Sequence, residues 1–226
     1  IADPDLNTAS LTPNLLSVST SGNTNGLIPS NADLLAMLQL NAGALSNSQG
    51  SLSWSFDSGS EFFDYLAAGE SLTLTYSFSV TDSDGGTSST QSITITVNGS
   101  NDGPHLTAAY NDILSGFVTE LPDLDPAELR AALTTSGSFS IADLDDSDSL
   151  SASVSSSSSS VDPSRLTNGL TTLGTLIPSI AANTTGGNPG SIAWSYSVAD
   201  SALDFLTAGQ SLTESFSVSI SDGRGG

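Results

Sequence analysis

The chain has 226 residues and no cysteine, and its three basic side chains stand against 24 Asp and Glu residues, for a formal net charge of −21. Phosphate recognition depends on basic side chains, so we expect neither nucleic acid nor an anionic membrane surface as a partner. The lack of cysteine rules out disulfides and thiolate zinc sites, and no apolar run reaches the ~20 residues of a spanning helix, so no membrane insertion is expected.

The first predicted element is a short helix over residues 30–40. Its start, Ser30-Asn31-Ala32-Asp33, is typical of a helix N-terminus because a serine side chain can accept a hydrogen bond from the first turn, and four leucines follow it. A second start of this kind, Asp125-Pro126-Ala127-Glu128, precedes Leu129 and Leu133. Both segments are interpreted as short helical insertions that cover a β-sandwich.

Alternating apolar and polar residues predict β-strands elsewhere. In residues 71–80 the apolar side chains occupy one parity and Ser or Thr the other, which is the period of a strand with one buried face. The same alternation predicts strands at residues 52–56, 93–97, 139–141, 150–154 and 192–196. Short Gly- and Asp-rich turns between such strands indicate an all-β fold of antiparallel β-sandwiches.

Two polar tracts, Ser155 to Ser160 and Asn183 to Gly190, predict loops because they have little apolar surface to bury. Glu214 interrupts an otherwise regular alternation, since it falls on the inward parity. We expect it at a strand end or at a sheet edge.

An offset of 140 residues superimposes much of the chain on itself. It brings Trp54 onto Trp194 and Asp82 onto Asp222, and it matches the start Ile1-Ala2-Asp3 to Ile141-Ala142-Asp143. Internal repetition of this kind indicates tandem modules. We predict two β-sandwich repeats, residues 1–104 without their N-terminal strand and residues 105–226 without their last strand, and interpret the chain as a piece of a longer array.

The residues 194–198, 202–212 and 221–226, together with 91–104 in the first copy, resemble the bacterial immunoglobulin-like and cadherin-like repeats called VCBS-type repeats. These repeats occur in large secreted RTX adhesins and biofilm proteins. The resemblance implies tandem Ig-like or cadherin-like modules of a type I secreted protein at the bacterial cell surface, which bind calcium where neighbouring repeats join.

The charge supports the same expectation by an independent route. Two carboxylates ~4 Å apart repel by roughly 4 kcal/mol at an effective dielectric near 20, and a divalent cation relieves that repulsion. Ca²⁺ takes six to eight oxygen ligands, mostly carboxylates and carbonyls. The alternative is an acidic surface that serves solubility without specific ions.

In cadherin-like junctions the Asx residues of the linker, a Glu near the module start and an Asp-x-Asp pair converge on the ions. The resemblance carries these roles to Asn101 and Asp102, to Glu120, and to Asp143 with Asp145. Residues spaced by two on an extended segment present their carboxylates on one side. Simple alternatives are a turn at Asn101-Asp102 and a solvated acidic loop at 143–148.

The same spacing occurs at Asp82 and Asp84, in a turn ahead of the last strand of the first copy, and at Asp3 and Asp5, the equivalents of Asp143 and Asp145. These four residues are further candidate calcium ligands. For Asp82 and Asp84 the alternative is that an aspartate in a glycine turn only accepts hydrogen bonds from backbone N–H groups.

Catalysis finds little support, and we expect no enzyme. The single histidine, His105, lies beside the linker, Ser195 recurs as Ser55 on a strand, and no glycine-rich phosphate loop or His-x-x-x-His pair is present. Trp54 and Trp194 lie on the inward parity, which favours a core position over a sugar-binding platform.

The sequence therefore predicts a non-enzymatic, calcium-stabilised extension repeat of a bacterial surface adhesin, with neighbouring repeats of the same protein as its partners. One alternative is a subunit that self-assembles into an extracellular filament by strand addition. Calcium-dependent carbohydrate binding is a third hypothesis.

Overall fold

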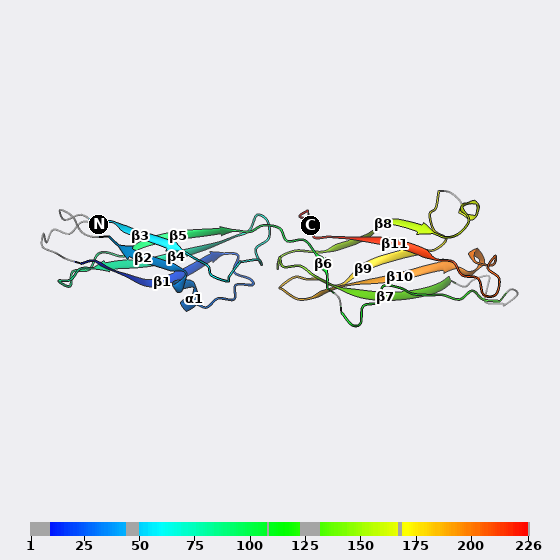
Figure 1. Ribbon diagram of the computed structural model, residues 1–226, viewed down its shortest axis with the longest axis horizontal. Coiled ribbons are helices and arrows are strands. Elements are labelled where there is room, and N and C mark those ends of the chain that lie inside the picture. Colours follow the sequence, from blue (N-terminus) through cyan, green and yellow to red (C-terminus); the bar gives the residue numbers. More distant parts are fainter. Residues whose placement is uncertain (1–9, 44–49, 108, 123–131, 167–168, 226) are drawn as a thin grey trace. The chain divides into compact units, whose positions relative to one another are not determined.

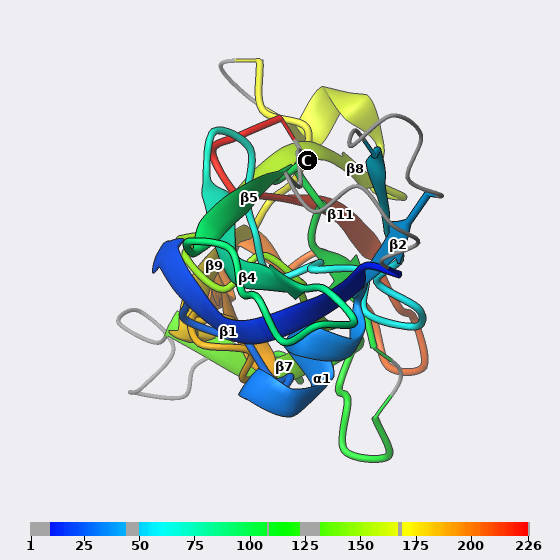
Figure 2. The same ribbon diagram turned by 90° about the vertical axis from the view of Figure 1, so that its left-hand side faces the viewer.

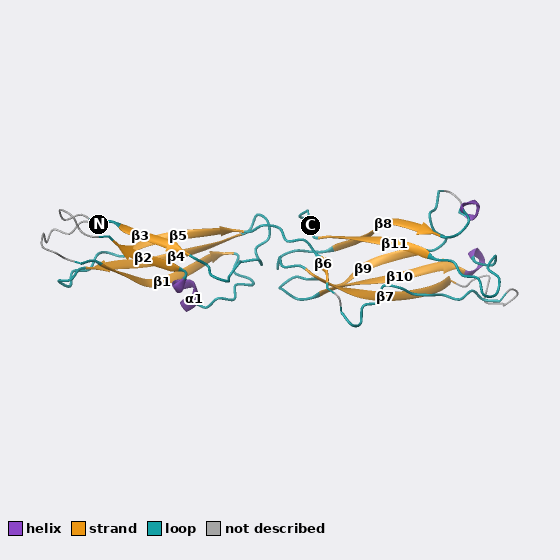
Figure 3. Ribbon diagram, in the orientation of Figure 1, coloured by secondary structure: helices purple, strands orange, loops and turns teal. Residues whose placement is uncertain are grey.

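The computed structural model of the chain describes residues 10–43, 50–107, 109–122, 132–166 and 169–225 (Figure 1). It divides into two compact units, Ile1–Ser100 and Asn101–Gly226. Both are built from antiparallel β-sheets, so the predicted all-β sandwich class is confirmed (Figure 3). None of the described helices has the length and the hydropathy to cross a membrane.

Unit 1 packs two antiparallel sheets around one apolar core. The larger sheet has the order β1-β4-β5 and the smaller pairs β2 with β3. The strands are β1 (Thr12–Gly22), β2 (Leu38–Ala42), β3 (Leu52–Phe56), β4 (Ser71–Thr81) and β5 (Gln91–Asn98). The alternation predicted for β4 is confirmed, because Leu72, Leu74 and Tyr76 are all buried in the core.

The predicted helix is present but short. Helix α1 (Asn31–Ala36) begins after Ser30, which forms a capping box with Asp33, and it lies next to β1 (Figure 2). The Tyr76 hydroxyl donates a hydrogen bond to the Leu34 carbonyl at 2.8 Å. The expectation of helix up to residue 40 is wrong, because residues from Leu38 onward pair with β3 instead.

Unit 2 has a sheet of order β6-β7-β10-β9 and a second sheet that pairs β11 with β8. Its core lies between them, where Phe139, Ile141 and Ile192 pack against apolar residues of the second sheet. The elements are β6 (His105–Leu106), β7 (Ala132–Ala142), β8 (Ser151–Ser159), the 3-10 helix η2 (Pro163–Arg165), β9 (Thr175–Ala182), β10 (Gly190–Ala199), the 3-10 helix η3 (Asp200–Ala202) and β11 (Glu214–Ser221).

Two further predictions fail in unit 2. The serine run from Ser155 is not a loop but part of β8, since pairing with β11 satisfies its backbone groups whatever its side chains bury. Leu133 belongs to β7 and not to a helix, while residues 125–131 of that predicted helix lie outside the described residues. The tract at 183–189 is a loop, as predicted.

Glu214 begins β11, which confirms its predicted strand-end position. Its carboxylate accepts hydrogen bonds from Leu173 N (2.6 Å), Gly174 N (3.1 Å) and the Tyr196 hydroxyl (2.8 Å). These three hydrogen bonds stabilise a glutamate whose side chain points inward. The equivalent residue of unit 1 is the buried Leu74.

The strand pairing repeats between the units. β1 pairs with β4 as β8 pairs with β11, and both pairs carry a β-bulge, opposite residues 77–78 in unit 1 and 217–218 in unit 2. β2 pairs with β3 as β9 pairs with β10. The internal repeat of the sequence is thus a repeat of strand order.

Candidate metal centre

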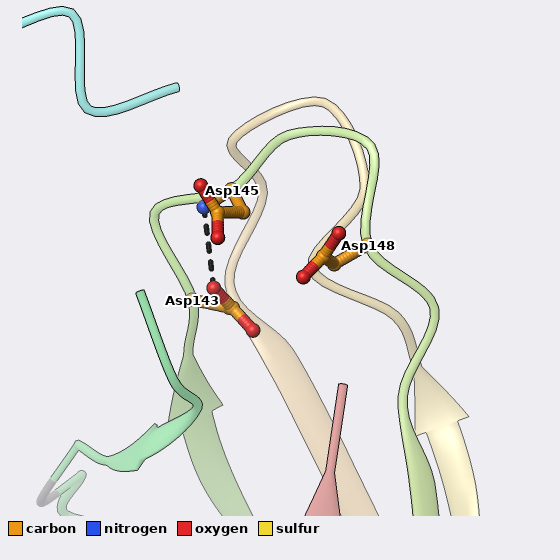
Figure 4. Close-up of side chains that lie close together, drawn as sticks. All are labelled: Asp143, Asp145 and Asp148. Atoms are coloured by element: carbon orange, nitrogen blue, oxygen red, sulfur yellow. Dashed lines mark hydrogen bonds between the residues drawn. The ribbon is translucent and has the colours of Figure 1, made fainter. Parts of the chain in front are cut away.

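The acidic run that begins at Asp143 forms the loop between β7 and β8. Its carboxylates do not face solvent: Asp145 is 0%, Asp148 1% and Asp143 5% exposed. One carboxylate oxygen from each of the three lies within 4.8 Å of the others. Figure 4 shows the three side chains turned toward a common space at the end of β7. The alternative of a solvated acidic loop is therefore wrong for these residues.

Backbone hydrogen bonds hold this loop in shape. Asp145 N donates to Asp143 Oδ1 at 3.2 Å, and Asp148 N donates to the Asp145 carbonyl at 3.1 Å. The loop at 183–189 lies behind it, since Gly186 N donates to the Asp146 carbonyl at 2.9 Å. The carboxylates are therefore positioned by the ends of four neighbouring strands.

The first residues of unit 2 reach the same place. Asp102 N donates to Asp145 Oδ2 at 2.8 Å, and Asn101 Nδ2 donates to Asp222 Oδ2 at 2.9 Å. Asp222, just after β11, also accepts from Arg224 N at 2.7 Å. Residues 101–104, which the sequence predicts at the end of the first repeat, therefore belong to the second unit, which begins at Asn101.

Several oxygens of this cluster are buried without a hydrogen-bond donor. They are Asp143 Oδ2, Asp145 Oδ1 and Asn101 Oδ1. A buried charged oxygen without a partner costs several kcal/mol, so such atoms are rare unless a ligand satisfies them. Two such carboxylate oxygens, together with the amide oxygen of Asn101, point to a positively charged ligand.

The pKa values of these aspartates also indicate an excess of buried negative charge. Burial, followed by the charges of Asp148, Asp102 and Asp143, raises the pKa of Asp145 to about 6. Burial also raises the pKa of Asp143, and the Asp222 charge is among the causes. Among the described residues, Arg224 is the cation that pairs with this cluster, with Nε 2.6 Å from Asp148 Oδ1. One guanidinium against five carboxylates leaves a large excess of negative charge.

The donor set fits a hard divalent cation. Asp143, Asp145 and Asp148 supply carboxylate oxygens, the ligand type that Ca²⁺ prefers. No imidazole or thiolate is part of the cluster among the described residues, which argues against zinc and copper.

Four of the predicted ligands come together here: Asn101, Asp102, Asp143 and Asp145. Asp148 and Asp222 also belong to the cluster and were not predicted as ligands. Two signals could have found them, since Asp148 ends the acidic run and Asp222 is the repeat equivalent of Asp82.

The expectation that Glu120 joins these residues is wrong. The neighbouring Leu121 N donates to Asp200 Oδ1 at 2.9 Å, and Asp200 follows the end of β10 that pairs with the start of β7. Asp143 follows the other end of β7. An 11-residue strand separates the two places, roughly 30 Å at ~3.3 Å per residue. The segment from Ile113 runs back along β7, which carries Glu120 away from the cluster.

In unit 1, Asp82 accepts hydrogen bonds from Asp84 N (2.9 Å) and Gly86 N (2.8 Å) through Oδ1, and Asp84 is exposed. Asp82 therefore follows the alternative stated above, in which an aspartate of a glycine turn accepts hydrogen bonds from backbone N–H groups. Among the residues described there, no acidic cluster gathers around them. Asp3 and Asp5 lie outside the described residues.

No protein-family model, curated protein or solved structure matches this chain.

Proposed function

We propose that the chain is a non-enzymatic, calcium-binding repeat module, and that Asp143, Asp145 and Asp148 hold the ion. The observation that carries the proposal is the set of buried oxygens without donors, Asp143 Oδ2 and Asp145 Oδ1 above all. Bound calcium supplies the positive charge that these oxygens lack. Asn101 Oδ1 is a fourth ligand from the segment that enters unit 2.

The ion acts on the connection between repeats. Asn101 and Asp102 directly follow Ser100, the last residue of unit 1. When the loop after β7 binds calcium, the ion fixes these two residues and shortens the free linker. Without the ion the carboxylates repel and the linker is released.

A calcium-stiffened spacer fits the rest of the chain. Tandem all-β units, a net charge of −21 and the lack of cysteine and lysine suit an acidic, extracellular array that holds a distal binding domain away from a bacterial surface. Extracellular modules bind calcium with dissociation constants on the order of 0.1 to 1 mM. Neighbouring repeats of the same protein are its partners.

Isothermal titration calorimetry tests the site. We expect saturable Ca²⁺ binding by the full chain and its loss in Asp145→Asn, whereas Asp204→Asn, which removes an exposed charge from the same unit, keeps it. Small-angle scattering then tests the role as a spacer. Calcium should narrow the range of maximum particle dimensions of the wild type and leave that of Asp145→Asn unchanged. Equal binding by the two variants would refute the assignment.

A further inference from the structure

The two tryptophans at equivalent positions of the repeats differ in burial. Trp194 on β10 is 8% exposed and belongs to the core of unit 2, whereas Trp54 on β3 is 50% exposed. The prediction of a core tryptophan thus holds for Trp194 and not for Trp54. Because both occupy the same strand of the repeat, the difference lies in what covers them.

In unit 2 the indole of Trp194 is covered by β7 and by the segment beyond it. Gly137 of β7 lies directly opposite Trp194. The indole Nε1 donates to the Ile113 carbonyl at 2.7 Å. The ring thus crosses β7 at Gly137 and reaches the next segment of chain.

Glycine is required at that crossing. A Cβ on Gly137 would lie 2.7 Å from Trp194 Cζ2, and a Cβ on Gly116 would lie 2.9 Å from Cη2. Both distances are shorter than carbon atoms tolerate. A strand that covers this tryptophan must therefore place glycine opposite the ring.

Unit 1 lacks the corresponding strand among its described residues. There β3 pairs with β2 alone, and no described strand occupies the edge that β7 fills on β10. Ser53, Trp54 and Ser55 are all exposed on β3. An exposed strand edge with free N–H and C=O groups is a template for pairing.

We propose that the edge of β3 that no described strand occupies is a docking site for one extended peptide strand of the β7 pattern. Such a strand alternates small polar with apolar residues and carries glycine opposite Trp54. It adds antiparallel to β3 and buries the indole, as β7 does on β10. Backbone pairing supplies affinity, and the glycine supplies selectivity. The proposal does not rest on calcium binding.

A peptide of residues 105–142 is the probe, because it contains β7 and the segment that covers Trp194 and has no tryptophan of its own. Added to the full chain, it should shift the tryptophan emission to the blue as Trp54 becomes buried. Hydrogen exchange should slow at residues 52–56. Both effects should persist in chelator, which separates this test from that of the calcium site.

The matched control is the same peptide with Gly137→Val, whose side chain meets the indole. We expect it to bind at least tenfold more weakly. Equal binding of the two peptides would overturn the proposal, as would protection confined to residues 190–199, which indicates exchange with β7 in unit 2. A blue shift that grows with the concentration of the chain alone and is insensitive to peptide would instead identify a second copy as the occupant.

Discussion

Asp145→Asn should stabilise the protein in chelator and abolish its stabilisation by calcium. The carboxylate is fully buried, and its pKa is raised from 3.8 to about 6. At neutral pH the folded state therefore carries an unfavourable charge. A shift of about two pKa units corresponds to about 3 kcal/mol. Asparagine removes this cost and still accepts the hydrogen bond from Asp102 N.

Calcium narrows this difference in stability, because it stabilises the wild type and not the variant. With a dissociation constant on the order of 0.1 to 1 mM, 10 mM Ca²⁺ stabilises the folded state by about 1.4 to 2.7 kcal/mol. The Asp145→Asn variant loses that gain. At about 4 °C per kcal/mol, the wild type should melt about 5 to 10 °C higher in calcium than in chelator, and the variant should show almost no difference.

Thermal unfolding followed by circular dichroism at pH 7.5, with and without calcium, measures both effects. Asp204→Asn is the control, since it removes an exposed charge from the same unit and should keep the full response to calcium. A variant that melts lower than the wild type in chelator would refute the electrostatic reasoning. One that keeps the calcium response would refute the role of Asp145 as a ligand.

Three further predictions concern unit 2. Without calcium, protonation of Asp145 should stabilise the fold fully below pH ~4, and this stabilisation should be lost as the pH rises through about 6, because the pKa is higher in the folded than in the unfolded state. Urea unfolding at a series of pH values from 4 to 7 measures the change in the free energy of unfolding. Glu214→Leu should cost about 2 to 3 kcal/mol by urea unfolding, since three donors lose their acceptor, and a neutral result would show that packing replaces them. Gly137→Val should cost about 2 kcal/mol or more through its clash with the Trp194 ring, while Ser136→Val, at an exposed neighbouring position, should cost little; equal melting temperatures would contradict this account.

The candidate site was only partly predictable from its residues. Asp143 and Asp145 lie two apart just after a strand, and that local spacing was enough to pair them. Asp148 belongs to the same acidic run, whereas Asp222 required knowledge of which loops meet, because it lies more than seventy positions further along the chain. Glu120 was assigned by its place near the start of a repeat, and the path of the segment along β7 carried it to the opposite end of the sheet.

The sequence by itself determined the strand class of this protein. Period-two alternation in β4 and the capped start of α1 are local patterns, readable wherever a chain has one buried face. Tertiary structure decided everything that depends on a partner strand. Leu38 lies in β2 and not in the helix, and the serine run from Ser155 lies in β8, because in each case a neighbouring strand pairs with the backbone. Trp54 and Trp194 share a sequence position and differ in burial, since burial depends on the segment that packs against the ring.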